Sequence, residues 1–250
     1  MENKLILHRG YKGKYPENSK ISIINALNEN LPTEIDIRLS KDSVPFIIHD
    51  ENINELFNGS GKISCHDSDY LKKFQYKIDH SQKLLSLRKL CEILKKNHPD
   101  IFIHIKEISD IKETIKILTE FNLVKNINFF ACYDNTLELV KIIKDKYSEY
   151  KVGLNFVENS LYYNEKYFNM VDFIWADEVT IPWIDKEKID FSHKLGKKIY
   201  APSPDLVMGS IFKENIKKRW KELLDLGIDG IFTDLPDEFR EFKEFQIKNE

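Results

Sequence analysis

The sequence predicts an α/β protein in which eight parallel strands and their helices close into a (β/α)8 TIM barrel. Short apolar runs alternate with longer amphipathic stretches along the whole chain, which is the pattern of repeated βα units. A length of 250 residues suits one such barrel. The alternative is an open doubly wound sheet, but no glycine-rich dinucleotide motif follows the first apolar run. We expect one barrel domain over residues 1–250.

Short apolar runs mark the expected strands, and their number decides the architecture. There are eight: Lys4–Leu7, Thr33–Leu39, Ile101–Lys106, Ile127–Cys132, Lys151–Phe156, Val171–Ala176, Lys198–Ala201 and Gly230–Thr233. Eight strands that alternate with helices are the number that closes a TIM barrel.

Amphipathic stretches between these runs, and one after the last, mark the expected helices. They are Ser19–Asn28, Leu85–Asn97, Asp110–Phe121, Asn135–Tyr147, Asn164–Asn169, Asp185–Leu195, Asn215–Leu226 and Asp237–Ile247. Ser19 and Asp110 are the types of residue that cap helix N-termini. Gly196 and Gly227 stand where a helix would turn back toward its strand.

The segment from Ser40 to Leu84 is far longer than an ordinary βα loop. Within it, Val44–Ile48 is expected to form a short extended piece that brings His49 back over the barrel mouth. We therefore expect an extended loop at about residues 40–84, whose length permits either a closing lid or a fixed structure.

Composition excludes several classes of partner. Lys and Arg number 38 against 41 Asp and Glu, so no global basic field attracts nucleic acid or anionic membranes, and phosphate binding must be local. Cys65, Cys91 and Cys132 fit neither a disulfide framework nor a zinc pattern. The apolar run Leu5–Leu7 is too short for a signal peptide, and no run is long enough to span a membrane. We expect a cytoplasmic protein with no stable membrane anchor and no nucleic-acid partner; its oligomeric state is left open.

Polar residues stand at the C-terminal ends of the first three expected strands, where TIM barrels carry their reactive groups. His8 follows the first strand, and Glu34 and Asp36 lie on the second. His104 and Lys106 lie on the third. Side chains two residues apart on a strand point the same way, so these groups converge at one mouth if they face the interior.

Two carboxylates stacked inside a barrel would repel each other and lose hydration unless a cation lay between them. Glu34 and Asp36 therefore indicate a hard divalent ion. The alternative is two exposed acids at a strand edge, because alternation with Ile35 and Ile37 is ordinary strand patterning. The neighbouring motifs favour the metal.

His8 and His49 each end an apolar run that delivers them to the same rim. Imidazole is the usual group for passing protons near neutral pH. Arg9, beside His8, has the planar guanidinium that grips a phosphate, with a surface ion pair as the alternative.

Five sequence blocks carry a resemblance to a known family. They are His-Arg-Gly at 8–10, Pro-Glu-Asn-Ser at 16–19, Glu-Ile-Asp-Ile-Arg-Leu-Ser-Lys-Asp at 34–42, Val-Pro-Phe-Ile-Ile-His-Asp at 44–50 and Gly-Ile-Asp-Gly-Ile-Phe-Thr-Asp-Leu-Pro at 227–236. With these blocks in order, the chain resembles the glycerophosphodiester phosphodiesterase family. The resemblance implies a TIM barrel of the PLC-like phosphodiesterase type, which agrees with the strand count.

The resemblance implies that His8 and His49 are the catalytic acid/base pair. It also implies that Arg9 and Lys106 bind the substrate phosphate. The alternative for Lys106 is an ordinary solvated lysine, which the strand alternation disfavours.

The resemblance further implies that Glu34 and Asp36 bind one divalent metal ion, with His104 at the third ligand position. Asn18 and Asp50 would support the site. Mg²⁺ is the expected ion, with Ca²⁺ or Mn²⁺ as alternatives. The family usually has an acidic residue where this chain has His104; imidazole adds no negative charge and suits Ca²⁺ poorly, so a hard cation should bind less tightly. Zn²⁺ or Mn²⁺, or no metal, are the alternatives for His104.

A second departure lies on the seventh strand. The family often carries Trp-Thr-x-Asn there, whereas this chain reads Tyr-Ala-Pro-Ser-Pro-Asp at 200–205. That tryptophan normally walls the substrate pocket. Trp175, Trp183 and Tyr200 are candidates to replace it.

The expected activity is that of a phosphoric diester hydrolase in lipid or glycerol metabolism. It would use a metal ion and two histidines to cleave a glycerophosphodiester, a small molecule, into an alcohol and glycerol 3-phosphate. The alternatives are a phosphodiesterase for surface-polymer or sugar-phosphate diesters, a transesterase of the sphingomyelinase D type, and a catalytically silent barrel that binds phosphodiesters.

Overall fold

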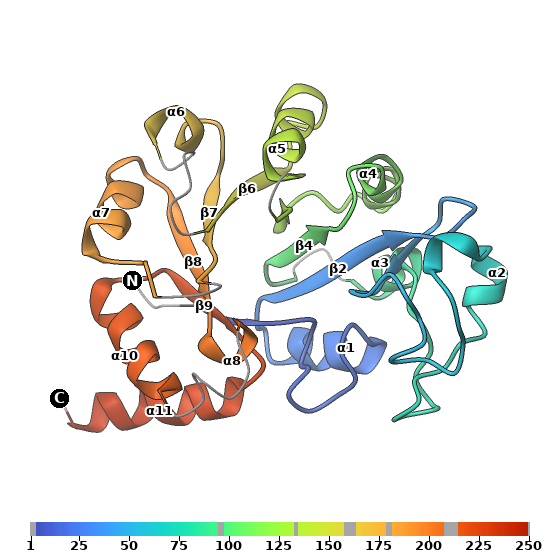
Figure 1. The fold of residues 1–250 in the computed structure, drawn as a ribbon, viewed down its shortest axis with the longest axis horizontal. Helices are drawn as coiled ribbons and strands as arrows, with labels where there is room; N and C mark the ends of the chain where they lie inside the picture. Colours follow the sequence, from blue (N-terminus) through green and yellow to red (C-terminus); the bar gives the residue numbers. More distant parts are fainter. Residues whose placement is uncertain are drawn as a thin grey trace.

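The computed structural model describes residues 4–94, 98–132, 135–157, 164–178, 182–207 and 215–249 of the chain. Parallel strands form a barrel at its centre, with helices around it (Figure 1). The barrel strands are β1 (Lys4–Leu7), β2 (Thr33–Leu39), β4 (Ile101–Ile105), β5 (Ile127–Phe130), β6 (Lys151–Phe156), β7 (Phe173–Ala176), β8 (Lys198–Pro202) and β9 (Gly230–Thr233). The predicted (β/α)8 fold class is confirmed.

Strand order determines which side chains meet at the barrel mouth. The ring runs β1-β9-β8-β7-β6-β5-β4-β2, and the pairing of Leu7 with Thr33 closes it. In the register of β2 against β4, Asp36 stands beside His104. The short strand β3 (Pro45–Ile47), expected from the sequence as an extended piece, pairs antiparallel with the end of β2.

The eight expected helices are present within the described residues, with shifted ends. They are α1 (Lys20–Asn28), α3 (Leu87–Ile93), α4 (Asp110–Glu120), α5 (Asn135–Lys146), α6 (Glu165–Phe168), α7 (Lys186–Lys194), α10 (Ile216–Leu226) and α11 (Pro236–Asn249). Ser19 is confirmed as the N-cap of α1, since its hydroxyl accepts the Ser22 N–H at 3.2 Å. The prediction of Asp110 as an N-cap is wrong: it is the first residue of α4, and its carboxylate accepts the N–H of Glu107 in the preceding turn.

Three one-turn helices have no counterpart in the prediction. They are the 3-10 helix Ile63–Cys65 and the α-helices α2 (Ser68–Leu71) and α8 (Pro204–Val207). A single turn is too short to show a hydrophobic period, so sequence patterning does not reveal it. Among the described residues, no helix combines the length and apolar character needed to cross a membrane.

The barrel interior is filled mainly by aromatic side chains. Its buried cluster consists of Ile6, Phe102, Phe130, Phe173, Trp175, Tyr200 and Phe232. A larger aliphatic cluster lies between the strands and the surrounding helices. Because aromatic rings fill the lower barrel, the open space lies above them, at the C-terminal ends of the strands.

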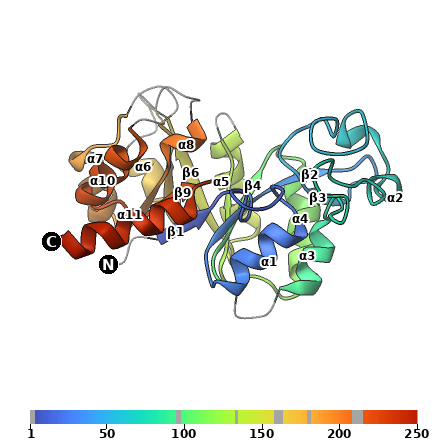
Figure 2. The same cartoon turned by 90° about the horizontal axis from the view of Figure 1, so that it is seen from below.

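Residues 40–84, here called the insertion lobe, project from one side of the barrel (Figure 2). The lobe has its own apolar cluster of Phe46, Ile48, Ile53, Phe57, Ile63, Leu71, Phe74, Tyr76 and Leu84. The hydroxyl of Tyr76 donates to the carbonyl of Glu17 at 2.6 Å, which ties the lobe to the loop before α1. An independent core and this bond favour a fixed lobe.

Candidate active site

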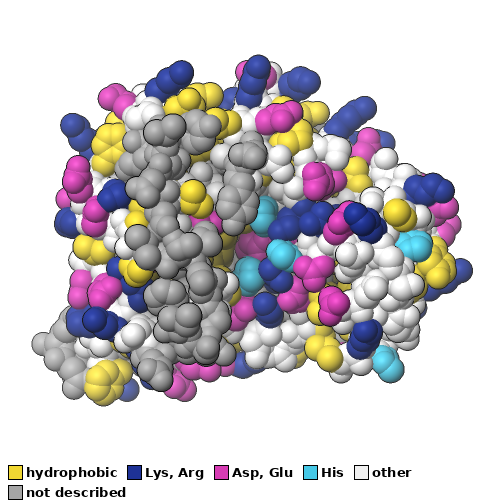
Figure 3. Space-filling view, in the orientation of Figure 1, with side chains coloured by type: hydrophobic (Ala, Val, Ile, Leu, Met, Phe, Trp, Pro, Cys, Tyr) yellow, Lys and Arg dark blue, Asp and Glu magenta, His cyan; other side chains and the backbone are white. Residues whose placement is uncertain are grey.

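A cavity of about 580 Å³ opens at the C-terminal ends of the barrel strands. Figure 3, drawn in the orientation of Figure 1, shows histidine, acidic and basic side chains gathered near the middle of the face that it displays. The lining residues are His8, Arg9, Glu34, Asp36, His49, His104, Ile105, Lys106, Phe130, Cys132, Asn135, Trp175, Asp177, Pro202 and Leu206. The cavity thus includes the residues predicted to carry catalysis, phosphate binding and metal binding.

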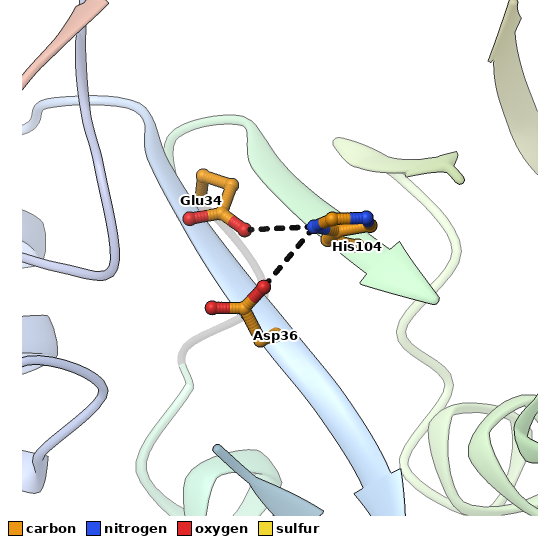
Figure 4. A group of neighbouring side chains, drawn as sticks. All are labelled: Glu34, Asp36 and His104. Atoms are coloured by element: carbon orange, nitrogen blue, oxygen red, sulfur yellow. Dashed lines mark ion pairs between the residues drawn. The ribbon is translucent and has the colours of Figure 1, made fainter. Parts of the chain in front are cut away.

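Glu34, Asp36 and His104 form one cluster in this cavity (Figure 4). Each offers a ligand atom, and these atoms lie within 4.8 Å of one another. His104 Nδ1 is 3.1 Å from Asp36 Oδ1 and 3.9 Å from Glu34 Oε1. The alternation of β2 places both carboxylates on its inner face, and the register with β4 brings His104 beside them.

The donor set of this cluster fits a divalent metal ion. Asp36 Oδ1 is buried and has no hydrogen bond of good geometry among the described residues; the two nitrogens near it, His104 Nδ1 and Lys106 Nζ, form ion-pair contacts at 3.1 and 3.2 Å. Burial, followed by the charge of Lys106, lowers the pKa of His104 to about 4. His104 is therefore a neutral imidazole, the form that binds metals. Two carboxylates and an imidazole suit Mg²⁺ or Mn²⁺ better than Ca²⁺.

The two buried carboxylates differ in their electrostatic surroundings. Burial and the charge of Asp36 raise the pKa of Glu34 well above its ordinary value. Burial acts in the same direction on Asp36, but Lys106, His104 and Arg9 outweigh it and hold the pKa of Asp36 well below the usual range. Lys106 Nζ lies 3.2 Å from Asp36 Oδ1. Asp36 is thus the permanently charged member of the cluster.

Arg9 joins the cluster to the loop before α1. Its backbone N–H donates to Glu34 Oε2 at 2.9 Å, and its guanidinium donates to Glu17 Oε1 at 2.8 Å. Its Nε lies 3.4 Å from Asp36 Oδ2 and has no hydrogen-bond partner within the described part of the chain. The chain turns sharply here, since both Arg9 and Gly10 have positive φ and a side chain at Gly10 would meet Ser22. The guanidinium is therefore held between the carboxylates of Glu17 and Asp36 at the wall of the cavity.

Two of the three histidines that line the cavity, His8 and His49, are each held by a carboxylate outside the metal-ligand cluster. His8 Nδ1 lies 2.9 Å from Asp234 Oδ1, and His49 Nδ1 lies 2.6 Å from Asp50 Oδ1. An imidazole that donates from Nδ1 to a carboxylate keeps Nε2 for proton transfer. The backbone carbonyl of His49 also accepts from Arg38 Nε at 2.7 Å, which fixes the end of β3 over the mouth.

The two residues predicted to support the site, Asn18 and Asp50, each contact one of its predicted members. Asn18 Nδ2 donates to Asp36 Oδ2 at 2.9 Å, and its Oδ1 accepts the Asp36 N–H at 3.3 Å. Asn18 therefore orients a candidate metal ligand. Asp50 orients His49.

An aromatic wall faces this polar cluster. The ring of His104 stacks on Phe130 with centroids 4.6 Å apart, and Phe130 stacks on Trp175 at 4.0 Å. Of the three candidates for the missing aromatic, Trp175 lines the cavity. Tyr200 lies deeper, in the aromatic barrel interior, and the Trp183 indole donates to the carbonyl of Asp177.

Two acidic residues of the mouth were not singled out from the sequence. Asp234 holds His8 and also lies 2.9 Å from Lys12 Nζ. Asp234 lies in the sequence block at 227–236 that carries the family resemblance, and this position could have identified it. Asp177 follows β7 directly and lines the cavity, but no recognised motif surrounds it.

A TIM barrel whose mouth combines two imidazole–carboxylate pairs with an acidic cluster has the composition of a hydrolase active site. Comparison with known families narrows this class. Residues 8–238 match the glycerophosphoryl diester phosphodiesterase family, and the chain belongs to that family. The expected enzyme class, a phosphoric diester hydrolase, is confirmed.

Individual relatives agree with this assignment. A glycerophosphodiester phosphodiesterase of Bacillus altitudinis is 26% identical over 247 residues, covering 94% of this chain and 95% of the relative. The structure of a glycerophosphodiester phosphodiesterase from Agrobacterium tumefaciens gives a TM-score of 0.72 at 20% identity, covering 95% of this chain and 99% of the other. An Oleispira antarctica phosphodiesterase, solved in complex with the product sn-glycerol-3-phosphate, gives a TM-score of 0.78 at 19% identity over 96% of both chains. These structures share the fold.

Proposed function

We propose that this protein hydrolyses a glycerophosphodiester to an alcohol and glycerol 3-phosphate, using a divalent metal ion and two histidines. The observation that carries the proposal is the grouping of two carboxylate-held imidazoles, His8 and His49, around one cavity with the Glu34/Asp36/His104 cluster. The product bound to the Oleispira antarctica phosphodiesterase is the product expected here.

The phosphate group of the substrate would bind between the two cavity cations. Arg9 and Lys106 both lie against Asp36, and Arg9 offers its planar fork to phosphate oxygens. Glu34, Asp36 and His104 would hold the metal ion, which supplies positive charge to the phosphate when bound. Mg²⁺ is the ion we propose.

His49 is suited to be the base. Burial, the largest influence, lowers its pKa, so the ring is neutral near pH 7 and can accept the proton of the attacking glycerol hydroxyl. His8 is suited to be the acid for the leaving alcohol oxygen. Burial acts to raise the pKa of its partner Asp234, but His8 and Lys12 outweigh this and lower it, so the carboxylate that holds His8 Nδ1 is ionised.

Attack by the glycerol hydroxyl forms a cyclic phosphate and releases the alcohol. Water then opens the ring with the two histidines in exchanged roles, which gives glycerol 3-phosphate. A transesterase would stop at the cyclic product.

Phosphorus NMR of the products tests this proposal. The purified protein is incubated with sn-glycero-3-phosphodiesters in the presence of Mg²⁺, Mn²⁺, Ca²⁺ or EDTA. We expect glycerol 3-phosphate with Mg²⁺ and no turnover with EDTA. A cyclic phosphate as the final product would identify a transesterase, and no turnover of any diester with any ion would identify a silent binding barrel.

A further inference from the structure

The cavity has a second charged pole, at Asp177, that the proposed reaction does not use. In the closed ring, β7 is four strands from β2 in either direction, so Asp177 stands across the mouth from Glu34 and Asp36. It follows β7 directly, at the level where the other reactive groups follow their strands. One side of the mouth therefore holds phosphate-binding cations, and the opposite side presents a carboxylate.

The carboxylate of Asp177 is fixed in place by neutral donors. Trp175 Nε1 donates to its Oδ1 at 3.0 Å, and Asn155 Nδ2 donates to its Oδ2 at 3.0 Å. Each oxygen can accept a further hydrogen bond. Asp177 thus has a defined orientation and unused acceptor capacity toward the cavity that it lines.

Asp177 differs from Asp36 and Asp234 in lacking a cation. Asp36 lies against Lys106, and Asp234 lies against Lys12. Within the described residues, no Lys, Arg or His forms an ion pair with Asp177. Asp177 is half-buried, and a carboxylate without a counter-charge in a cavity wall is stabilised when a ligand provides that charge.

The neighbouring aromatics decide which kind of cation fits. Trp175 packs against Phe130 with centroids 4.0 Å apart, and against Phe232 with centroids 3.7 Å apart. Trp175 is only 6% exposed, so little of its ring is available to form the aromatic cage that recognises a quaternary ammonium group. A carboxylate with free acceptor positions instead favours a cation that donates N–H bonds.

We propose that Asp177 determines specificity by binding a primary ammonium group on the alcohol part of the substrate. This inference rests on the proposed function: the phosphate lies against Arg9 and Lys106, and the 2-aminoethyl group reaches across the mouth to Asp177. The favoured substrates are zwitterionic diesters of the glycerophosphoethanolamine class.

A matched pair of substrates tests the inference on the unmodified enzyme. Glycerophosphoethanolamine and the corresponding 2-hydroxyethyl diester differ in an ammonium against a hydroxyl group. We expect kcat/KM to favour the ammonium substrate about tenfold or more, the size of a charge-assisted hydrogen bond. Glycerophosphocholine, which has no N–H donor, is expected to fall below glycerophosphoethanolamine.

Asp177→Asn should bring the ratio of the two kcat/KM values close to one. Asp190→Asn, the same change of charge at an exposed residue of α7 that does not line the cavity, should leave the ratio unchanged. A ratio near one in the unmodified enzyme overturns the inference, as does an equal loss on both substrates in Asp177→Asn, because Asp177 would then act on the shared glycerol or on structure. If Asp177→Asn does not fold, the ratio of the unmodified enzyme still decides. The absence of hydrolysis of every diester would instead count against the proposed function.

Discussion

The two sides of the barrel mouth are built differently. The side formed by β1, β2 and β4 carries a dense polar network in which every acidic side chain lies near a cation or an imidazole. The side formed by β5 and β7 carries stacked aromatic rings and Asp177, whose bonds come from neutral donors. The first side has the groups needed for phosphoryl chemistry. The second carries none of those groups, and it is the side at which we propose that substrate choice is determined.

The largest effect should come from removing either of the two histidines that we propose as acid and base. His8→Ala and His49→Ala are each expected to lower kcat by about 10² to 10⁴, the usual contribution of a general acid or base. His193→Ala is a matched control, because His193 forms a comparable pair with Asp229 at 2.8 Å but is absent from the cavity. Wild-type turnover in both His8→Ala and His49→Ala would contradict the assignment.

Metal binding should depend on the β2 side alone. Asp36→Asn is expected to raise the Kd for Mn²⁺, measured by titration calorimetry, by at least about 100-fold, because it removes a charged ligand. Asp177→Asn is the control from the opposite side and should leave this Kd within about twofold. An equal rise of the Kd for Mn²⁺ in the two variants would mean that metal binding also depends on the Asp177 side of the mouth.

The carboxylate behind His8 should matter less than His8 itself. Asp234→Asn keeps the shape but loses the charge that stabilises the imidazolium, so kcat should fall by about 10- to 100-fold with little change in KM. Lys12→Met removes the other partner of Asp234 and should cost less. If Lys12→Met lowers kcat as much as Asp234→Asn does, the loss comes from the ion pairs of Asp234 in general and not from its contact with His8.

The pH profile tests the role of His49. Because burial lowers the pKa of His49, its ring stays neutral, and able to act as a base, to a lower pH than a free imidazole. The acid-side fall of kcat/KM should therefore have its midpoint below pH 6.5, the ordinary pKa of an imidazole. Activity then falls up to about tenfold per pH unit below that midpoint. Asp50 raises the pKa of His49, so Asp50→Asn should move the midpoint to still lower pH. A midpoint above pH 6.5 would exclude His49 as the base.

The smallest effect should come from the insertion lobe. Tyr76→Phe removes the bond to the Glu17 carbonyl and should lower the free energy of unfolding, measured in urea, by about 1 kcal/mol. Tyr70→Phe is the control, since Tyr70 is half exposed. We expect kcat to change less than about twofold in both variants. A tenfold loss of kcat in Tyr76→Phe would make the lobe part of the catalytic machinery.

The β2 side of the site was predicted from the sequence because its signals are local. Glu34 and Asp36 share a face through the two-residue period of a strand, and His8 and His49 end their apolar runs. The register of β2 with β4 then places His104 and Lys106 as expected. On the opposite side, Trp175 was one of three candidates for the missing aromatic, and Asp177 gave no signal, because a single acid after a strand is common in any barrel.

The sequence by itself determined the eight-strand barrel, the inward alternation of its polar residues and the family, since these depend on periodicity and contiguous motifs. The tertiary structure alone decided which distant residues meet. Asp234 reaches His8 across 226 positions because β9 pairs with β1, and Asp177 faces Asp36 because β7 lies across the ring from β2. Ring closure is a long-range property of strand pairing, and no local pattern of residues encodes it.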